Sequence, residues 1–383
     1  MTPRIAVLIA STLLASPAPA PAAPGAGPAH FAMFGTLLTG APQIRPRWKR
    51  AIDEVARTMG EAVGKIYVAR YFPPETKARV EQLVKNVRAA MAQRIDALSW
   101  MSPETKARAR QKLAAYRVKI GYPDRWRDYS VLAITTVDAL GNARRAAAFE
   151  YDRRLAQLGE RFDRDEWRMT PMTVNAYFGS SNEIAFPAAV LQPPAFDPRA
   201  DDAANYGGIG TAIGHEISHG FDDQGSRFDA AGALDNWWSS DDAAHFQAAT
   251  NRLVAQYSAY CPVAAAAGQP ARCVNGALTL GENIADLAGL TIAYDAYRRS
   301  LGGKPAPVID GLSGDQRFFL AWAQQWRRLY RDRDLANRLV NDPHSPSEYR
   351  VSIVRNLDAW YDAFKPGEAD ALYLAPDQRV RIW

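Results

Sequence analysis

The sequence has only two cysteines among 383 residues and no hydrophobic run long enough to span a bilayer comfortably. The cysteines, Cys261 and Cys273, have no nearby histidine, so their spacing does not indicate a zinc site. In an oxidising compartment they would close a small disulfide loop, and the alternative is a pair of free thiols. We expect no integral membrane span.

The N-terminus has the pattern of an export signal. Arg4 precedes an apolar stretch at residues 5–15, and small residues at 18–23 offer cleavage sites. We expect a cleavable signal peptide at residues 1–23 and a flexible linker at residues 24–30. The protein would then be periplasmic or secreted, and a membrane anchor formed by the uncleaved signal is the alternative.

The charge is unevenly spread, but it gives little support to nucleic-acid binding. Residues 45–128 hold twenty Lys and Arg against nine Asp and Glu, whereas the whole chain has a net charge of +5. These basic residues alternate with apolar ones at helical spacing, which favours a solvated helix face, and no nucleic-acid motif accompanies them. We expect no nucleic-acid partner.

The N-terminal part of the sequence predicts a helical lobe. Residues 47–120 carry apolar side chains at three- and four-residue steps, and Ser102 with Pro103 begins a new helix within them. A Gly- and Pro-containing connection follows at 120–126, and another helix is expected at about 131–160. We place the helical lobe at residues 31–165 and a second domain at residues 166–383.

The second domain combines few strands with many helices. Residues 172–178 are β-branched and aromatic and predict a strand; residues 184–194 are a second extended candidate, whose prolines favour an edge or a loop. Helices are expected at about 205–221, 280–300 and 314–330, and a last one begins near Pro346. The fold class is mainly α, of the α+β type, with a small mixed sheet.

Residues 215–219 read His-Glu-Ile-Ser-His, an HExxH motif within a predicted helix. Positions i and i+4 project from one face, so His215 and His219 can both reach one tetrahedral metal ion. Glu216 lies beside that face, where it can orient and deprotonate a water molecule. The alternative is a helix with satisfied histidines. Glycines from Gly207 to Gly220 predict close backbone packing, and no Lys-Ser/Thr follows them as a phosphate-binding loop requires.

A third ligand is expected at residues 279–290. Glu282 and Asp286 are again i and i+4, on an otherwise apolar helix with Thr279 as a plausible cap. Burying two carboxylates costs free energy unless they meet a cation or hydrogen-bond donors. We predict Glu282 as a ligand and Asp286 as the hydrogen-bond partner of a ligand histidine. An exposed acidic face is the alternative.

One further histidine is held between two prolines. Residues 345–348, Ser-Pro-Ser-Glu, predict a capping box, which places His344 on a rigid loop before a helix and Arg350 in the second turn of that helix. A fixed His344 is suited to donate a hydrogen bond to an oxyanion. The alternative is an exposed loop histidine.

These segments resemble the neprilysin family of zinc endopeptidases. The resemblance is carried in order by VNAYF (174–178), HEISHGFDDQG (215–225), GENIADLAG (281–289), HSPSEYR (344–350) and the terminal RVRIW, and it covers roughly residues 31–383. It implies a thermolysin-like zincin catalytic domain at residues 166–383, faced by a lobe that is part of the family's N-terminal peptidase domain. Family members are longer here, so the chain is expected to be N-terminally shortened: either it is a truncated or recombined gene product, or its active cleft is more open than is usual in the family.

The resemblance also implies the role of each matching residue in the metal site. His215, His219 and Glu282 match the ligands of one Zn²⁺ per chain. Glu216 matches the general base, and Asp286 matches the carboxylate behind His215. Val380 stands where vertebrate relatives carry a disulfide cysteine.

Four further matches imply peptide substrates. Asn175 and Ala176 match edge-strand positions that pair with the substrate backbone. His344 matches the residue that stabilises the oxyanion, and Arg350 matches the one that binds a substrate carbonyl. We predict an exported zinc metalloendopeptidase that hydrolyses internal bonds of oligopeptides. The alternatives are a catalytically idle zinc-binding remnant that binds peptides or is structural, and another zinc hydrolase such as an amidase.

Overall fold

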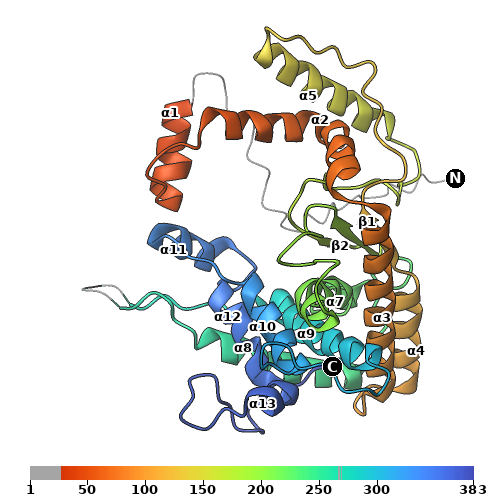
Figure 1. Ribbon diagram of the computed structural model, residues 1–383, viewed down its shortest axis with the longest axis vertical. Coiled ribbons are helices and arrows are strands. Elements are labelled where there is room, and N and C mark those ends of the chain that lie inside the picture. Colours follow the sequence, from red (N-terminus) through yellow and green to blue (C-terminus); the bar gives the residue numbers. More distant parts are fainter. Residues whose placement is uncertain (1–26, 266–267, 269) are drawn as a thin grey trace, which may run out of the picture.

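The computed structural model describes residues 27–265, 268 and 270–383, which are mostly helical around a small sheet (Figure 1). The α-helices are α1 (Gly27–His30), α2 (Arg47–Tyr71), α3 (Pro74–Ala97), α4 (Pro103–Ala114), α5 (Ala139–Ala156), α6 (Asp202–Asn205), α7 (Thr211–Ser218), α8 (Ser240–Ser258), α9 (Leu280–Ser300), α10 (Gly314–Gln325), α11 (Asp332–Asn341), α12 (Ser347–Val351) and α13 (Asp358–Phe364). Short π- or 3₁₀-helical segments are η1 (Phe31–Leu38), η2 (Tyr206–Gly210), η3 (Gly225–Arg227) and η4 (Ser352–Asn356). The strands are β1 (Arg117–Gly121), β2 (Tyr177–Gly179) and β3 (Glu183–Pro187). The predicted fold class is confirmed.

The sheet has the strand order β1-β3-β2, with β1 parallel and β2 antiparallel to β3. The prediction of helix as far as residue 120 is wrong at its end, because residues 117–121 form β1. This strand is defined by its partner: Ile120 lies opposite Phe186 and Gly121 lies opposite Pro187. Since that pairing joins residues far apart in sequence, helical periodicity upstream does not reveal it.

The two predicted strands are shorter than expected. Of residues 172–178 only Tyr177 and Phe178 belong to β2, whereas Asn175 and Ala176 lie just before it. The expectation of an edge or loop for residues 184–194 is wrong for their first part, because β3 is the central strand. Its proline, Pro187, is the last strand residue, where the missing N–H interrupts no further pairing.

The core is formed where α3, α7 and α9 pack together, in the lower half of Figure 1 and right of its centre. Helices α7 and α9 approach closely at two glycines: a Cβ on Gly214 would lie 2.6 Å from Gly289 O, and one on Gly289 would lie 2.5 Å from His215 N. The predicted close backbone packing is confirmed. It matters for the site because the HExxH motif lies at the end of α7, with His219 as the C-cap, and the two predicted carboxylates are on α9.

Helix starts follow the capping rules in part. Ser102 caps α4 as predicted, with its side chain accepting from Thr105 N. Helix α5 begins at residue 139, later than the predicted 131, because the Asp138 side chain caps it by accepting from Gly141 N. Thr279 occupies the N-cap position of α9, but its side chain makes no capping bond.

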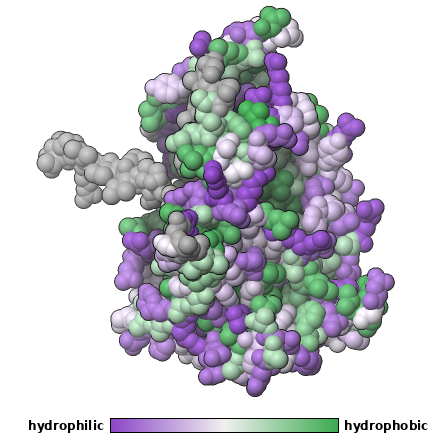
Figure 2. Space-filling model, turned by 90° about the vertical axis from the view of Figure 1, so that its left-hand side faces the viewer, coloured by the Kyte–Doolittle hydropathy of each residue, from purple (hydrophilic) through white to green (hydrophobic). Residues whose placement is uncertain are grey.

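Helices α2 and α5 extend away from the core at the top of Figure 1 and pack on each other. The buried residues of α2 are Gly60, Glu61 and Gly64, and the only buried residue of α5 is Ala146. Figure 2 shows hydrophobic residues interspersed with hydrophilic ones on one face, including at the level of these helices. Exposed apolar side chains on η1, α2 and α5 include Met33, Phe34, Leu37, Trp48, Ile52, Val55, Ile66, Tyr151 and Leu155.

The predicted domain boundary at residues 165 and 166 stays a prediction, and the sheet joins its two sides through the pairing of β1 with β3. The predicted signal peptide lies outside the described residues, and the predicted linker at 24–30 overlaps α1. Cys261 and Cys273 are joined in a disulfide. Among the described residues, no helix combines the length and apolarity that crossing a bilayer would require.

Candidate metal centre

Three side-chain atoms from α7 and α9 converge on one point. His215 Nε2 lies 3.0 Å from His219 Nε2, and Glu282 Oε2 lies 3.1 Å from the first and 3.7 Å from the second. Spacing i, i+4 places the two imidazoles on one face at the end of α7. The contact between Gly214 and Gly289 brings α9 close enough for Glu282 to join them. The predicted ligand set is therefore assembled by the fold.

The cluster fits a tetrahedral zinc ion. Ligands at about 2.0–2.1 Å in tetrahedral array lie about 3.3 Å from one another, and the three observed separations bracket that value. Glu282 Oε2 is buried and has no hydrogen-bond partner among the described residues. Two imidazole nitrogens and one carboxylate oxygen that face a common point are an arrangement that a cation satisfies.

Two carboxylates fix the orientation of the imidazoles. His215 Nδ1 lies 2.8 Å from Asp286 Oδ1, as predicted, and His219 Nδ1 lies 2.7 Å from Asp222 Oδ2. Each Nδ1–H therefore donates to a carboxylate, which leaves both Nε2 lone pairs for a metal. The role of Asp222 was missed from the sequence, although an acid three residues after a ligand histidine is a usable signal.

The electrostatic field of the site favours a cation. Burial opposes the charged form of His219, but the carboxylates of Glu282 and Asp222 outweigh it and raise its pKa to about 10. Burial would also raise the pKa of Glu282, yet the neighbouring histidines hold it well below its usual range. Glu282 thus keeps its charge and attracts either protons or a metal ion to the imidazoles.

Glu216 is buried beside the cluster, with 8% of its surface exposed. Burial raises the pKa of its carboxyl group, and the adjacent histidines act in the opposite direction. A carboxylate whose basicity is raised in this way is better suited to accept a proton than a free one.

His344 reaches the same point from the loop before α12. Its Nε2 lies 3.2 Å from Glu282 Oε2, and its Nδ1 lies 2.9 Å from Asp342 Oδ1. Asp342, also missed from the sequence, holds the ring through this contact. The predicted capping box is wrong: Pro346 is the N-cap of α12, and Ser345 Oγ instead donates to Asn283 Oδ1 on α9 at 2.8 Å. This hydrogen bond joins the loop that carries His344 to α9.

Comparison with known proteins decides the family. The sequence pattern of peptidase family M13 matches residues 175–380, and that of its N-terminal region matches residues 19–123. The chain belongs to peptidase family M13. The neprilysin-family resemblance is thereby confirmed. Curated relatives include human neprilysin, 36% identical over 91% of this chain, and mouse endothelin-converting enzyme 1, 37% identical over 92%.

Solved structures support the same assignment. Zinc metalloprotease Zmp1 of Mycobacterium tuberculosis, in complex with an inhibitor, superposes with a TM-score of 0.88 at 54% identity and covers 92% of this chain. PepO of Lactobacillus rhamnosis has a TM-score of 0.78 at 34% identity and covers 91%. The M13 chain spans about half the length of these relatives: 48% of human neprilysin, 46% of the converting enzyme, 54% of Zmp1 and 53% of PepO.

Arg350 of this M13 chain contacts the metal centre through Asp286. Its guanidinium donates through Nε and Nη2 to both oxygens of Asp286, at 2.7 and 2.6 Å, and it stacks 4.0 Å from the ring centroid of Trp326. It therefore orients the carboxylate that orients His215. Its predicted contact with a substrate carbonyl stays a prediction, and so does the substrate role of Asn175 and Ala176, which lie just before edge strand β2.

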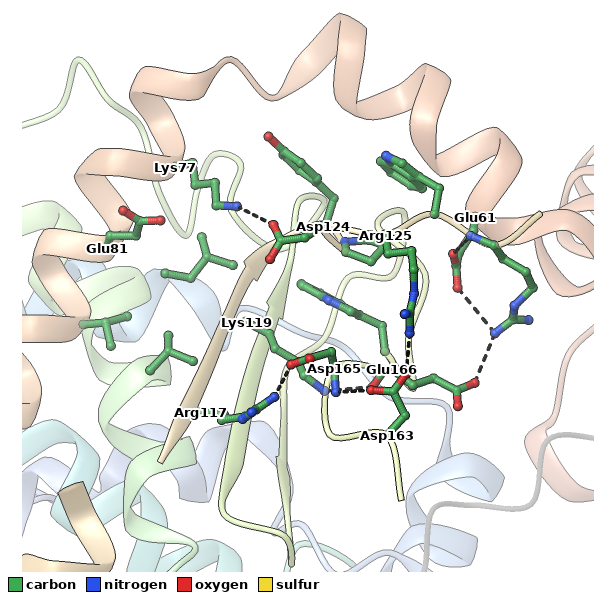
Figure 3. Close-up of a pocket in the computed structure, with 18 of the residues that line it drawn as sticks. Glu61, Lys77, Glu81, Arg117, Lys119, Asp124, Arg125, Asp163, Asp165 and Glu166 are labelled. Carbon is green, nitrogen blue, oxygen red and sulfur yellow. Dashed lines mark hydrogen bonds and ion pairs between the residues drawn. The ribbon is translucent and has the colours of Figure 1, made fainter. Parts of the chain in front are cut away.

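A cavity of about 830 Å³ lies elsewhere in the M13 chain, between α3, β1 and the 122–127 connection (Figure 3). No residue of the metal cluster lines it. Most of its charges pair within the cavity or just behind it: Lys77 with Asp124, Arg117 with Asp165, Arg125 with Asp163 and Lys119 with Glu183. Its charges are largely satisfied, in contrast to the unpaired lone pairs of the metal centre.

Proposed function

We propose that this chain is a zinc metalloendopeptidase that hydrolyses internal bonds of oligopeptides. The observation that carries the proposal is the convergence of His215 Nε2, His219 Nε2 and Glu282 Oε2 within one ion's coordination distance, beside the buried Glu216. Membership of peptidase family M13, and relatives named as zinc metalloprotease and neprilysin, support the same chemistry.

The residues divide the work as follows. A zinc ion held by His215, His219 and Glu282 would act as a Lewis acid toward a carbonyl and would lower the pKa of water. Glu216 takes the proton of the attacking water and returns it to the departing amine. Its burial keeps that proton away from solvent between the two transfers.

The remaining residues stabilise charge and hold the peptide. His344, with Nδ1 bonded to Asp342, donates from Nε2 to the oxyanion that develops on the cleaved carbonyl. Asn175 and Ala176 pair with the backbone of an extended peptide along β2, and Arg350 contacts a substrate carbonyl as well as Asp286. By the family resemblance, we expect a large apolar residue to be preferred just after the cleaved bond.

Export is part of the proposal. Residues 1–23 carry the signal pattern, and a disulfide between Cys261 and Cys273 suits a periplasmic or secreted protein. N-terminal sequencing of the protein from the periplasm or medium tests this, because cleavage would remove the segment up to about Ala23. Recovery of the intact N-terminus in a membrane fraction would support the uncleaved anchor instead.

Purified protein provides the main test. We expect one zinc per chain by elemental analysis, and cleavage of an internally quenched oligopeptide that is lost with a chelator and restored by zinc. His219→Ala should lose both zinc and cleavage. Stoichiometric zinc without cleavage would favour the idle zinc-binding protein, and turnover of a non-peptide amide alone would favour an amidase.

A further inference from the structure

A buried lysine of α4 contacts the turn that follows α7. Lys112 is 1% exposed, and its Nζ donates to Gly225 O and to Phe228 O, both at 2.6 Å. Both acceptors are backbone carbonyls, so the ammonium group acts on the path of the chain at residues 225–228. Helix α4 belongs to the predicted helical lobe, whereas the turn belongs to the HExxH segment.

The same turn carries the carboxylate that holds His219. Asp222 Oδ1 accepts from Gln224 N at 2.9 Å and from Gly225 N at 2.7 Å, while Asp222 Oδ2 faces His219 Nδ1 at 2.7 Å. Gly225 is therefore bonded on both sides, by its N–H to Asp222 and by its carbonyl to Lys112. A Cβ on Gly225 would collide with His219 O, so the turn packs directly against the end of α7.

Keeping the Lys112 ammonium group charged at this buried position costs free energy. Burial lowers its pKa to about 8, and the carboxylates of Asp222 and Asp229 offset this effect only in part. The rings of Phe221 and Trp237 lie 5.7 and 5.9 Å away and would accommodate an apolar side chain. Packing alone therefore does not require a lysine here. The specific contribution of the ammonium is two charge-assisted hydrogen bonds that fix the turn.

We propose that Lys112 is a positioning residue for the metal centre: it fixes the 222–228 turn, and through Asp222 it fixes the orientation of the His219 imidazole. The inference rests on the proposed function, because it assigns Lys112 to the metal site of that function. Outer partners of metal ligands change metal affinity by about 10–100-fold when replaced. Asp222 contacts His219 directly, whereas Lys112 contacts only the turn that carries Asp222. We therefore expect a loss of zinc affinity at the lower end of this 10–100-fold range.

Lys112→Met tests the proposal, with Lys119→Met as the matched control. Lys119 is also buried, at 7% exposure, but its Nζ bonds Glu183 Oε2 and Glu166 O, away from the turn. Zinc affinity is measured by competition with a chromophoric chelator, and the visible spectrum of the cobalt-loaded protein reports ligand geometry. We expect Lys112→Met to raise the zinc Kd about 10-fold and alter the spectrum. Lys119→Met should lower the unfolding temperature, with both metal readouts as in the wild type.

A double-mutant cycle with Asp222→Asn tests the route. If Lys112 acts through Asp222, Lys112→Met should weaken zinc binding in the Asp222→Asn background by less than about 2-fold, because the affected contact is already lost. Independent effects that multiply would overturn the proposal, as would a zinc Kd for Lys112→Met equal to that of the wild type. Lys112→Gln, which keeps a donor and disturbs the core less, answers the same question if Lys112→Met does not fold.

These readouts separate the inference from the proposed function. Wild-type protein that binds zinc but cleaves no peptide would contradict the peptidase proposal and leave the affinity test of Lys112 intact. Cleavage by the wild type, together with unchanged zinc affinity in Lys112→Met, would contradict the inference alone.

Discussion

The contact between α7 and α9 makes a quantitative prediction for Gly289→Ala. A Cβ there would lie 2.5 Å from His215 N and 2.9 Å from Thr211 O, whereas ordinary contact begins at 3.4 Å. The helices must therefore separate by up to about 0.9 Å. Overpacking of this kind costs about 1–3 kcal/mol, and replacing a helical glycine by alanine returns about 1 kcal/mol. The net loss of unfolding free energy should be about 0–2 kcal/mol.

The metal site should be affected more than stability. Ligand distances in metal sites tolerate only about 0.2 Å, and Glu282 on α9 would move away from His215 and His219 on α7. We expect Gly289→Ala to weaken zinc binding by about 10–100-fold, by analogy with loss of an outer-shell contact. Chelator competition gives the zinc Kd, and urea unfolding of the metal-free protein gives the stability.

Gly210→Ala is the matched control for this prediction. Gly210 precedes the same helix, but its Cβ would lie 3.3 Å from the nearest atom, on the Tyr206 ring, so only a small adjustment is needed. We expect a zinc Kd within about 3-fold of the wild type. Equal zinc affinities for Gly289→Ala and the wild type would refute the claim that the glycine contact sets the ligand geometry.

Three further predictions follow from the contacts of charged residues. Burial opposes ionisation of Asp242, but hydrogen bonds led by Ser102 hold its pKa at about 2, against an ordinary value of 3.8. The ionised Asp242 therefore contributes about 2 kcal/mol to the free energy of unfolding above pH 4, and this contribution is lost as the pH falls to 2. Asp242→Asn should accordingly flatten the acid side of the plot of unfolding free energy against pH, measured by urea unfolding. Asp286→Asn leaves Arg350 buried without its counter-charge and should lower the unfolding free energy by about 3–5 kcal/mol, measured by urea unfolding. His344→Ala should lower kcat by about 10²–10³-fold with the zinc Kd unchanged, whereas a lost zinc would contradict its role at the oxyanion.

The sequence predicted those parts of the site that depend on helix periodicity. The i, i+4 spacing of His215 with His219, and of Glu282 with Asp286, determines which side chains share a face, and the fold then only has to bring two faces together. Gly214 is one of the glycines from which close backbone packing was predicted. The partner helix, with Gly289 on it, was not predicted, because packing pairs residues far apart in the chain.

The parts that were missed depend on turns and on non-local pairing. Asp222 and Asp342 act from loops whose backbone direction no periodicity specifies, and Lys112 lies more than a hundred residues before the turn that it holds. Strand β1 is too short to show a period of its own, and it is defined by its pairing with β3. The exposed apolar side chains of η1 and α2 likewise follow a helical pattern that does not say whether a face is covered.

The most direct test of the account compares the wild type with Glu216→Gln, both loaded with zinc. The substitution keeps size and shape but removes the carboxylate that moves the proton. We predict one zinc per chain in both proteins, and a kcat/KM for an internally quenched oligopeptide that is about 10²–10⁴-fold lower in Glu216→Gln. Zinc-loaded wild type that cleaves no faster than Glu216→Gln would contradict the assignment of this centre as a peptidase.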